Sequence, residues 1–313
     1  MTSWNHTVVT FFQFSPFSRI PAIQGSLFCL VLLMYLSTLV GNILIILITM
    51  ADATLHSPMY FFLKNLSFLE IGYTTSTIPK MLVNLLTERK GISFLGCATQ
   101  MYVFSLLGIT ECCLLAAMAY DRYVAICQPL HYTAVMSWNK CFLLSAASWS
   151  IGFLVALGQT TLIFTLPYCG PNRINHFFCD LLPLLKLACV ATYKNEIITY
   201  IVAVLFIMVP FLLIVVSYVQ ILHTIIKMPS AGGKRKTFST CSSHLVVVTL
   251  FYGSGIVTYL RPKAFYSSSS NKLLSLFYTL MSPMMNPLIY SLRNKEVKQS
   301  LRRLVTKKIN VKC

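Results

Sequence analysis

The stretch that decides the fold runs from Leu27 to Ile48 and reads LFCLVLLMYLSTLVGNILIILI, without a single formal charge. The nearest charged residues are Arg19 before it and Asp52 after it. A helix needs about 20 predominantly apolar residues to cross the hydrocarbon core of a bilayer. This stretch therefore predicts one membrane-spanning helix.

Six further stretches of similar length follow along the chain. Four of them carry no formal charge, one contains Glu70 and one contains Glu111. The sequence therefore predicts an all-α membrane protein built as a bundle of seven transmembrane helices. The six stretches are Pro58–Leu82, Cys97–Ile126, Cys141–Pro167, Ile197–Ile226, Thr237–Leu260 and Leu273–Leu292.

The composition agrees with this class. The chain has 313 residues, of which 56% are hydrophobic and 11% are charged. A soluble domain carries about 25% charged residues, so this chain has too few to cover a surface in water. The net charge of +17 arises from a shortage of acids, 8 against 25 lysines and arginines. Intrinsic disorder, collagen and a nucleic-acid-binding basic domain are excluded, and the expected partner is the lipid bilayer.

The distribution of charge indicates the orientation. Seven crossings place the two termini on opposite sides, and short loops rich in lysine and arginine stay in the cytoplasm. The stretch after the seventh span and the loop between spans five and six are the most basic, whereas the stretch before span one contains only Arg19. An outside N-terminus is therefore expected.

The N-terminal stretch supports this orientation. Asn5-His6-Thr7 is a glycosylation sequon, which is useful only at a lumenal end. A cleavable signal peptide is not evident, so the first span is expected to act as an uncleaved signal-anchor. We expect an extracellular N-terminus at 1–22, the bundle at 23–292, and a cytoplasmic amphipathic helix and tail at 293–313.

The tail has a helical pattern. Apolar residues share one face and basic residues the other, which is typical of a short amphipathic eighth helix on the inner leaflet. A solvated basic tail is the alternative, and the regular spacing argues against it. The apolar face contains Val297, Leu301, Leu304 and Val305, and the basic face contains Lys298, Arg302 and Arg303.

Four of the eleven cysteines face outward under this topology: Cys97, Cys169, Cys179 and Cys189. An even number in an oxidising compartment suggests two disulfides, and three pairings are open from the sequence alone. A metal site formed by His176 and Cys179 is the alternative, but no second ligand pair has suitable spacing. A loop tied to the third helix would form a lid over the outer mouth of the bundle.

Polar residues occur at membrane depth. Glu111 lies about 21 Å along its helix from Cys97, and Glu70 lies about 18 Å from Pro58 at the opposite face, so the two acids reach similar depth. Charges at this depth are candidates for function. We expect one cluster that binds a cation or shares a proton; two isolated protonated glutamates are the alternative. The cluster would consist of Asn42, Glu70, Glu111 and Asn286.

The inner end of the third helix contains the adjacent pair Asp121 and Arg122. Such an arginine can swap partners between two states, although a snorkelling cation is the commoner reading. The seventh span contains Pro283 and Pro287, which break backbone hydrogen bonds. Either a hinge or a static kink would follow, and the sequence leaves both open.

Taken together, these residues resemble the rhodopsin-like G-protein-coupled receptors, and within them the odorant receptors. The resemblance spans nearly the whole chain, and the ordered set of motifs is very specific. The motifs are Gly41-Asn42, PMYFFL (Pro58–Leu63), MAYDRYVAIC (Met118–Cys127), Ser217-Tyr218, KTFSTCSSH (Lys236–His244), PMMNPLIY (Pro283–Tyr290) and the three cysteines of the long outer loop.

The resemblance implies that Cys97 pairs with Cys179 and Cys169 with Cys189. Glu70 stands at the sodium-site acid, where Asp is usual, so a sodium ion at Glu70 and Glu111 is the one cofactor to consider. The implied switch residues are Asp121, Arg122, Tyr123, Tyr218, Asn286, Pro287 and Tyr290, with the two tyrosines Tyr123 and Tyr218 as partners of Arg122.

Small departures from the family pattern occur at Thr237, Met285 and Val190-Ala191. The resemblance further implies a plasma-membrane protein of olfactory cilia. Its inner face would engage a stimulatory olfactory-type G protein and raise cyclic AMP. A non-olfactory chemosensory receptor of the same fold is the alternative.

The upper bundle is the natural place for a ligand. Counting along the helices from their outer ends gives a ring of candidates without a charged side chain, suited to a small, volatile, largely apolar odorant. Ser105, Thr279 or a tyrosine hydroxyl would supply one or two hydrogen bonds, and Tyr252 is the position that the family couples to helix movement. The candidates are Phe104, Ser105, Gly108, Ile109, Val202, Phe206, Tyr252, Ile256, Tyr259 and Thr279.

Other classes fit less well. A transporter would show paired interrupted segments, and the spans show none. An enzyme is not expected, because G-x-S-x-G, H-E-x-x-H and a phosphate-binding glycine loop are absent from the sequence. A retinal photoreceptor needs a Schiff-base lysine in span seven, and Leu273–Leu292 contains no lysine.

Overall fold

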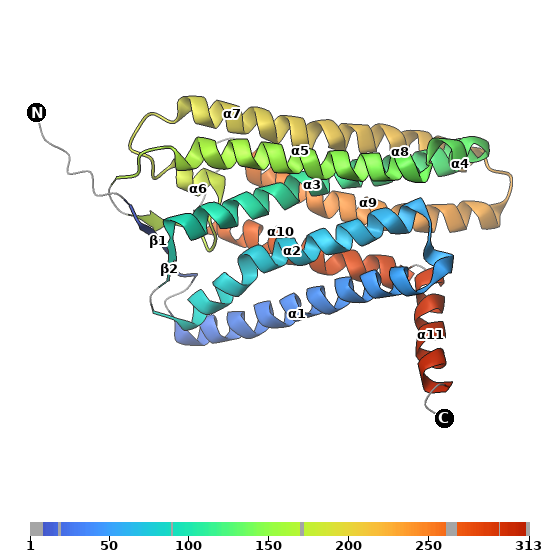
Figure 1. Ribbon diagram of the computed structural model, residues 1–313, viewed down its shortest axis with the longest axis horizontal. Coiled ribbons are helices and arrows are strands. Elements are labelled where there is room, and N and C mark those ends of the chain that lie inside the picture. Colours follow the sequence, from blue (N-terminus) through green and yellow to red (C-terminus); the bar gives the residue numbers. More distant parts are fainter. Residues whose placement is uncertain are drawn as a thin grey trace, which may run out of the picture.

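The computed structural model describes residues 9–17, 20–88, 90–169, 172–260, 268–293 and 295–310. Long helices run side by side in one bundle, with the strand β1 (Phe11–Phe14) at one end and the helix α11 (Lys295–Asn310) at the other (Figure 1). The two ends of the described chain therefore lie at opposite ends of the bundle, as an odd number of crossings requires.

Seven long helical segments of the described chain, called rods below, form the bundle, and they confirm the seven predicted spans in order. The first predicted span, Leu27–Ile48, is shorter than its helix. The fourth predicted span ran to Pro167, past the end of its helix at Phe164. The rods are α1 (Pro21–Ala51), α2 (Pro58–Leu86), α3 (Phe94–Cys127), α5 (Trp138–Phe164), α7 to α8 (Tyr193–Lys227), α9 (Ala231–Tyr259) and α10 (Ser268–Arg293).

Local signals start several of these helices. Proline occupies the first turn of α1 and α2, where the missing N–H costs nothing. Ser93 caps α3 by accepting a hydrogen bond from the Gly96 N–H at 3.0 Å, which satisfies one of the free donors of the first turn. Ser230 caps α9 in the same way through the Gly233 N–H at 3.3 Å.

The sequence predicts one uninterrupted span at Ile197–Ile226. In the structure, the fifth rod is interrupted by a turn that is not α-helical. It consists of α7 (Tyr193–Ala203), a π-helical turn η3 (Val204–Met208) and α8 (Val209–Lys227). A π turn inside an α-helix is rare and occurs frequently at functional sites. This turn lies at the level of the cavity described below.

The outer surface of the bundle is apolar. Large side chains such as Leu33 on α1 and Val219 on α8 are more than half exposed, which a bilayer accommodates and water does not. Among the described helices, five are long and apolar enough to cross a membrane by length and composition alone. The other two are α2, which contains Lys64, Glu70 and Lys80, and α10, which begins with three serines.

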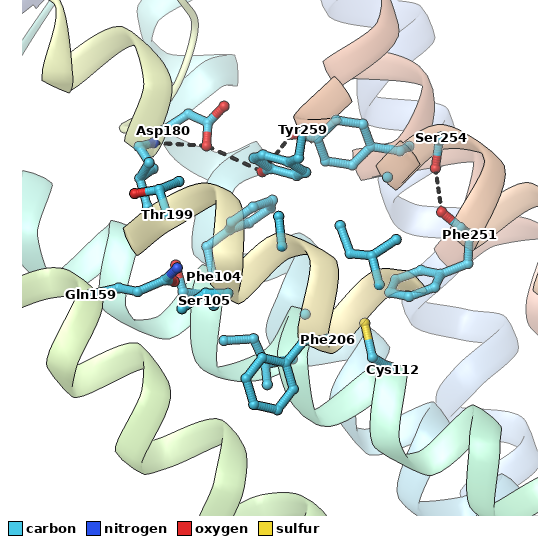
Figure 2. Close-up of a pocket in the computed structure, with 18 of the residues that line it drawn as sticks. Phe104, Ser105, Cys112, Gln159, Asp180, Thr199, Phe206, Phe251, Ser254 and Tyr259 are labelled. Carbon is cyan, nitrogen blue, oxygen red and sulfur yellow. Dashed lines mark hydrogen bonds between the residues drawn. The ribbon is translucent and has the colours of Figure 1, made fainter. Parts of the chain in front are cut away.

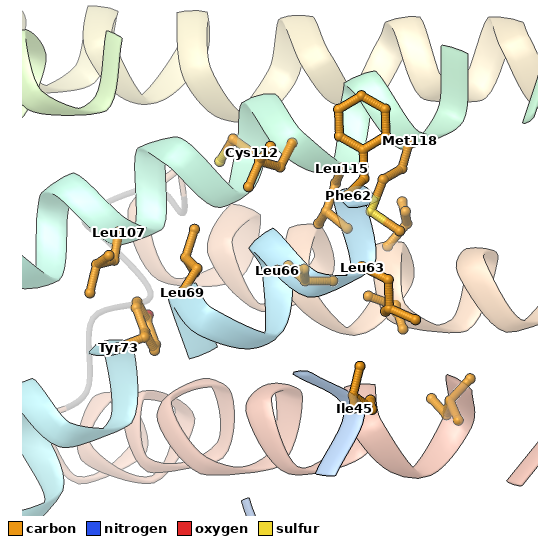
Figure 3. Packing of buried hydrophobic residues seen from close by; sticks show 14 of the residues in the cluster. Ile45, Phe62, Leu63, Leu66, Leu69, Tyr73, Leu107, Cys112, Leu115 and Met118 are labelled. Carbon is orange, nitrogen blue, oxygen red and sulfur yellow. The ribbon is translucent and has the colours of Figure 1, made fainter. Parts of the chain in front are cut away.

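The interior is closely packed. Phe62 of α2 lies beside Leu115 and Met118 of α3, and all three are buried (Figure 3). Glycine permits the closest approach of helices: a Cβ at Gly41 of α1 would lie 2.9 Å from a side-chain carbon of Pro287 in α10. The motif Gly41-Asn42 therefore sets the packing of α1 against α10.

A small sheet caps one end, and the sequence did not predict it. Strand β1 pairs antiparallel with β2 (Gly91–Ser93) and parallel with β3 (Arg173–Ile174), in the order β2-β1-β3. Phe12 and Phe14 of β1 are buried in a second core cluster with Cys97 and Cys179. Short helical turns complete the described chain: η1 (Ala53–Leu55), η2 (Pro129–His131), α4 (Tyr132–Val135) and α6 (Leu181–Leu185).

Helix α11 confirms the amphipathic eighth helix. It leaves the end of α10 at a steep angle to the bundle (Figure 1). Val297 is buried and Leu301 half-buried, whereas Lys298, Arg302 and Arg303 are exposed. The side chains of Leu304 and Val305, which complete the predicted apolar face, lie outside the described residues.

Candidate functional site

An inner cavity of about 120 Å³ lies within the bundle at the end that carries the small sheet. An apolar cavity of about 150 Å³ is known to hold a benzene molecule, so this space suits a ligand of similar size. Figure 2 shows side chains that surround it, and the lining residues come from α2, α3, α5, α7, η3, α9 and α10 and from the loop that ends in α6. The site is therefore a mainly apolar pocket within the bundle.

Seven of the ten predicted ligand residues lie on the wall of this cavity. On α3 the whole predicted face is present, because residues at positions i, i+1, i+4 and i+5 share one side of a helix. The fifth rod supplies two of the seven, one of them within the π turn. The seven are Phe104, Ser105, Gly108, Ile109, Val202, Phe206 and Tyr259.

Three predicted residues are not on the cavity wall of this structure, and their contact with a ligand stays a prediction. Tyr252 is fully buried and donates its hydroxyl to the carbonyl of the lining residue Cys112 at 2.8 Å, so it links α9 to α3 beside the cavity. Thr279 donates its hydroxyl to the Ser275 carbonyl one turn earlier in α10. Ile256 is half-buried elsewhere on α9. Whether a side chain of α9 or α10 reaches the cavity depends on how the helix is rotated about its own axis.

The lid over the cavity is held by a disulfide. Cys97 at the start of α3 is bonded to Cys179, with a Cα–Cα distance of 5.5 Å, and Cys169 is bonded to Cys189. The Cys179 N–H donates to Gln100 Oε1 at 2.9 Å. Because the Cys179 sulfur is used in this bond, it is not a ligand for the alternative metal site with His176.

The predicted ring lacked Asp180, which stands next to Cys179 and lines the cavity. Its Oδ1 accepts hydrogen bonds from the Leu181 N–H at 2.8 Å and from the Tyr259 hydroxyl at 3.2 Å (Figure 2). Burial raises the pKa of this carboxyl to about 6. The ten predicted residues include no charged side chain, and the wall adds this one acid. Its place directly after Cys179, in the loop tied to α3, was the signal in the sequence that could have pointed to it.

A second, outer cavity of about 260 Å³ lies on the other side of Asp180, and Asp180 is the one described residue that lines both. Arg173 and Lys186 line its exposed part. His176 lies in its wall and hydrogen bonds to Ser275 at 3.0 Å. Burial, with the nearby charge of Lys272, lowers the pKa of His176 to about 3, so the imidazole is neutral. Asp180 and its neighbours thus separate the outer cavity, which is polar, from the inner cavity, which is mainly apolar.

The four polar residues predicted at membrane depth lie close together below the cavity. The Asn286 amide donates to the carboxyl of Glu70, and the carboxyl groups of Glu70 and Glu111 are neighbours. The Asn42 amide donates to the Pro283 carbonyl at 3.3 Å. One oxygen of each of the four side chains is buried without a partner. Oxygen ligands of this kind fit a small hard cation, and two neighbouring carboxyls equally fit a shared proton.

The end of the bundle opposite the inner cavity, called the inner end below, holds the predicted switch residues. Asp121 is buried and accepts a hydrogen bond from the Tyr132 hydroxyl at 2.8 Å, while Arg122 is half-buried. The Tyr218 hydroxyl is bonded to Nδ1 of His244 at 2.8 Å, which joins α8 to α9. His244 was not among the predicted switch residues.

The remaining predicted positions are accounted for as follows. The Tyr123 hydroxyl accepts a bond from the Gln128 amide at 3.5 Å. Pro287 is buried against α1, and α10 remains helical through both of its prolines. The side chain of Tyr290 and the whole of Asn5 lie outside the described residues.

A seven-helix bundle with a cavity beneath a disulfide-tied loop, and Asp-Arg-Tyr at the inner end of its third helix, defines a rhodopsin-like receptor. A family profile described as "Olfactory receptor" matches residues 28–308. The chain therefore belongs to the olfactory receptor family. It is an odorant receptor, not an enzyme, and G-protein coupling with a rise in cyclic AMP follows from that family.

Individual relatives cover almost the whole chain. Human Olfactory receptor 10A4 is 57% identical over 302 residues, which make up 96% of each chain. Human Olfactory receptor 10A2 is 58% identical over 292 residues, 93% of this chain and 96% of its own. Human Olfactory receptor 10A5 is 56% identical over 304 residues, 97% of this chain and 96% of its own. Together with the apolar bundle, these matches make the chain a multi-pass protein of the plasma membrane.

Proposed function

We propose that the receptor binds a small, volatile, largely apolar odorant in the inner cavity and activates a stimulatory olfactory-type G protein at the end of the bundle that carries Arg122. The observation that carries this proposal is the cavity of about 120 Å³ beneath the loop tied to α3. Its walls are mainly apolar, and its few polar groups can orient a ligand.

Continuous helices connect the inner cavity to the opposite end of the bundle, which carries Arg122. Helix α9 contributes Phe251 and Tyr259 to the cavity wall and carries His244 nearer its inner end. The fifth rod contributes Phe206 to the same wall and carries Tyr218, the hydrogen-bond partner of His244. Movement of either rod at the cavity therefore reaches the Tyr218–His244 contact.

An agonist acts by binding one arrangement of the bundle better than the other, because equal affinity would shift nothing. In the proposed mechanism, the odorant displaces the inner end of α9 from α8. This displacement frees Arg122 from its local partners and opens a cleft for the G protein. Asn42, Glu70, Glu111 and Asn286 would stabilise the resting arrangement by holding a sodium ion or a shared proton.

The proposal includes the orientation and the location of the receptor. The N-terminal stretch 1–22, with glycosylated Asn5, lies outside, and the stretch 293–313 lies in the cytoplasm of olfactory cilia. The concentration of basic residues in 293–313 supports this orientation.

The test is a cyclic AMP reporter cell that expresses the receptor with an N-terminal epitope tag. We expect the tag to stain intact cells and a chemically diverse odorant panel to give concentration-dependent cyclic AMP signals. Odorant-dependent nucleotide exchange on the purified olfactory-type G protein would establish direct coupling. Ion or solute flux in reconstituted vesicles without nucleotide exchange would instead indicate a transporter.

A further inference from the structure

The inner cavity has a polar side and an apolar side. Phe206 and Phe251 lie on the apolar side in Figure 2, at the level of the π turn and the middle of α9. Three polar side chains lie together on the other side, and each comes from a different helix, α3, α5 or α7. This polar trio consists of Ser105, Gln159 and Thr199.

The polar trio has unused hydrogen-bonding capacity. The Thr199 hydroxyl is buried without a partner. The side chains of Ser105 and Gln159 form no hydrogen bond with any residue that the structure describes. A buried polar group without a partner costs free energy that a suitable ligand restores. Other polar groups on the wall are satisfied, since Ser254 donates to the Phe251 carbonyl at 2.8 Å and Tyr259 donates to Asp180.

We propose, resting on the odorant-binding function above, that the polar trio binds the neutral oxygen group of an alcohol, aldehyde or ketone, while the hydrocarbon part lies against Phe206. Hydroxyl and amide groups both donate and accept hydrogen bonds. The trio can therefore serve an acceptor such as a carbonyl and a donor such as an alcohol.

The charge of the cavity selects against anions. Its described wall contains one acid, Asp180, and no lysine, arginine or histidine. A ligand carboxylate beside Thr199 would meet this acid without any counter-ion, and with a pKa of about 6 the acid is ionised at neutral pH. A fatty acid is therefore a poor ligand compared with an alcohol of the same length.

An amine is a separate case. The Asp180 carboxylate accepts two hydrogen bonds on Oδ1, from the Leu181 N–H and from the Tyr259 hydroxyl, and its second oxygen can still pair with a cation. A protonated amine would therefore bind to Asp180 and not to the polar trio. Neutral oxygenated compounds remain as the ligand class of the trio.

The test compares small probes of matched size on the wild-type receptor and on five variants, one of which is Asp180→Asn. The probes are hexan-1-ol, hexanal, hexan-2-one, hexylamine, hexanoate and n-heptane. The variants Thr199→Val, Gln159→Leu and Ser105→Ala remove the polar groups with little change of shape. The matched control is Thr160→Val, which removes a neighbouring buried hydroxyl that also lacks a partner but does not line the cavity. Binding is read as thermal stabilisation of receptor in nanodiscs, and signalling as cyclic AMP in cells.

We expect the neutral oxygenated probes to bind more tightly than hexanoate and n-heptane, and any binding of hexylamine to depend on Asp180 and not on the trio. Thr199→Val and Gln159→Leu should each weaken the binding of the neutral oxygenated probes by about fivefold, which is the size of one net hydrogen bond. Thr160→Val should leave binding unchanged. Asp180→Asn should bring hexanoate closer to hexan-1-ol.

Several results would overturn the inference: no binding by any neutral oxygenated probe, tighter binding of hexanoate, or equal effects of the trio variants on hexan-1-ol and n-heptane. These outcomes are separate from failure of the proposed function. Selective binding in nanodiscs without any cyclic AMP signal would contradict the signalling role and leave the ligand class intact.

Discussion

The two ends of the bundle are held together by different kinds of bond. At the end with the inner cavity, two disulfides and a three-stranded sheet fix the loops above the helices. At the end with Arg122, the described contacts are noncovalent, such as the Tyr218–His244 and Asp121–Tyr132 hydrogen bonds, and the nearby Cys127 and Cys241 are free. The difference indicates which end can move: a net hydrogen bond is worth about 1 kcal/mol, so the inner contacts are easily exchanged.

The largest expected effect comes from removing the disulfides at the end with the inner cavity. The double variant Cys97→Ser with Cys179→Ser removes a link between residues 82 apart in sequence. Loss of a native disulfide costs about 2–5 kcal/mol, so we expect surface staining to fall close to background. The double variant Cys169→Ser with Cys189→Ser, which spans 20 residues, should cost about 1 kcal/mol less on the chain-entropy account.

The control for these variants is Cys29→Ser, which removes a free and exposed thiol and should leave staining unchanged. Equal losses for the long and the short disulfide would contradict the entropic argument.

The next effect concerns the mobile end. Arg122→Ala should abolish the cyclic AMP response because the switch side chain is lost, while surface staining stays largely intact because the side chain is only half-buried. Staining and reporter signal measured on the same cells separate the two. A normal odorant response from this variant would remove Arg122 from the switch.

A smaller effect is expected at the contact between α8 and α9. Tyr218→Phe removes the hydroxyl that binds His244 and keeps the ring stacked on it. If this contact holds the inner end closed, its loss of about 1 kcal/mol should raise basal cyclic AMP by about fivefold. Tyr120→Phe, at an exposed position of α3, is the matched control. A lower basal signal would mean that the contact belongs to the open arrangement.

The smallest effect should come from the surface ion pair at the inner end. Arg303 lies 3.6 Å from Asp52, and more than half of the Arg303 side chain is exposed. Such pairs contribute about 0–1 kcal/mol, so Arg303→Ala should change potency by less than about threefold. A complete loss of signalling would show that α11 contacts the G protein directly through this residue.

The helices were predictable because a membrane imposes length and apolarity on each crossing. The face of α3 that lines the cavity was predictable for a similar reason: Cys97 fixes the outer end, and a constant rise per residue gives the depth of Phe104 and Ile109. The amphipathic spacing around Val297 in α11 likewise depends only on local periodicity.

The rest depends on contacts between distant residues. Tyr252 and Thr279 were placed in the ring because their depth was right, but their rotation is set by the packing of α9 and α10, which the sequence does not encode locally. The Thr279 hydroxyl is satisfied within its own helix. The sheet joins Phe12 to Ile92 and Phe14 to Ile174, so no single segment carries its signal.

The π turn at Val204–Met208 has a consequence for how such receptors diversify. Its wider ring offsets the angular phase of the segment that bears Val202 from that of the segment that bears Tyr218. Substitutions in the segment with Val202 can therefore change which odorants bind, without rotating the segment in which Tyr218 contacts His244. Inserting one residue into the regular α-helix after the turn is different, because each added α-helical residue rotates everything beyond it by about 100°. Evolution in this rod should accept exchanges of side chains more readily than insertions into its α-helical parts.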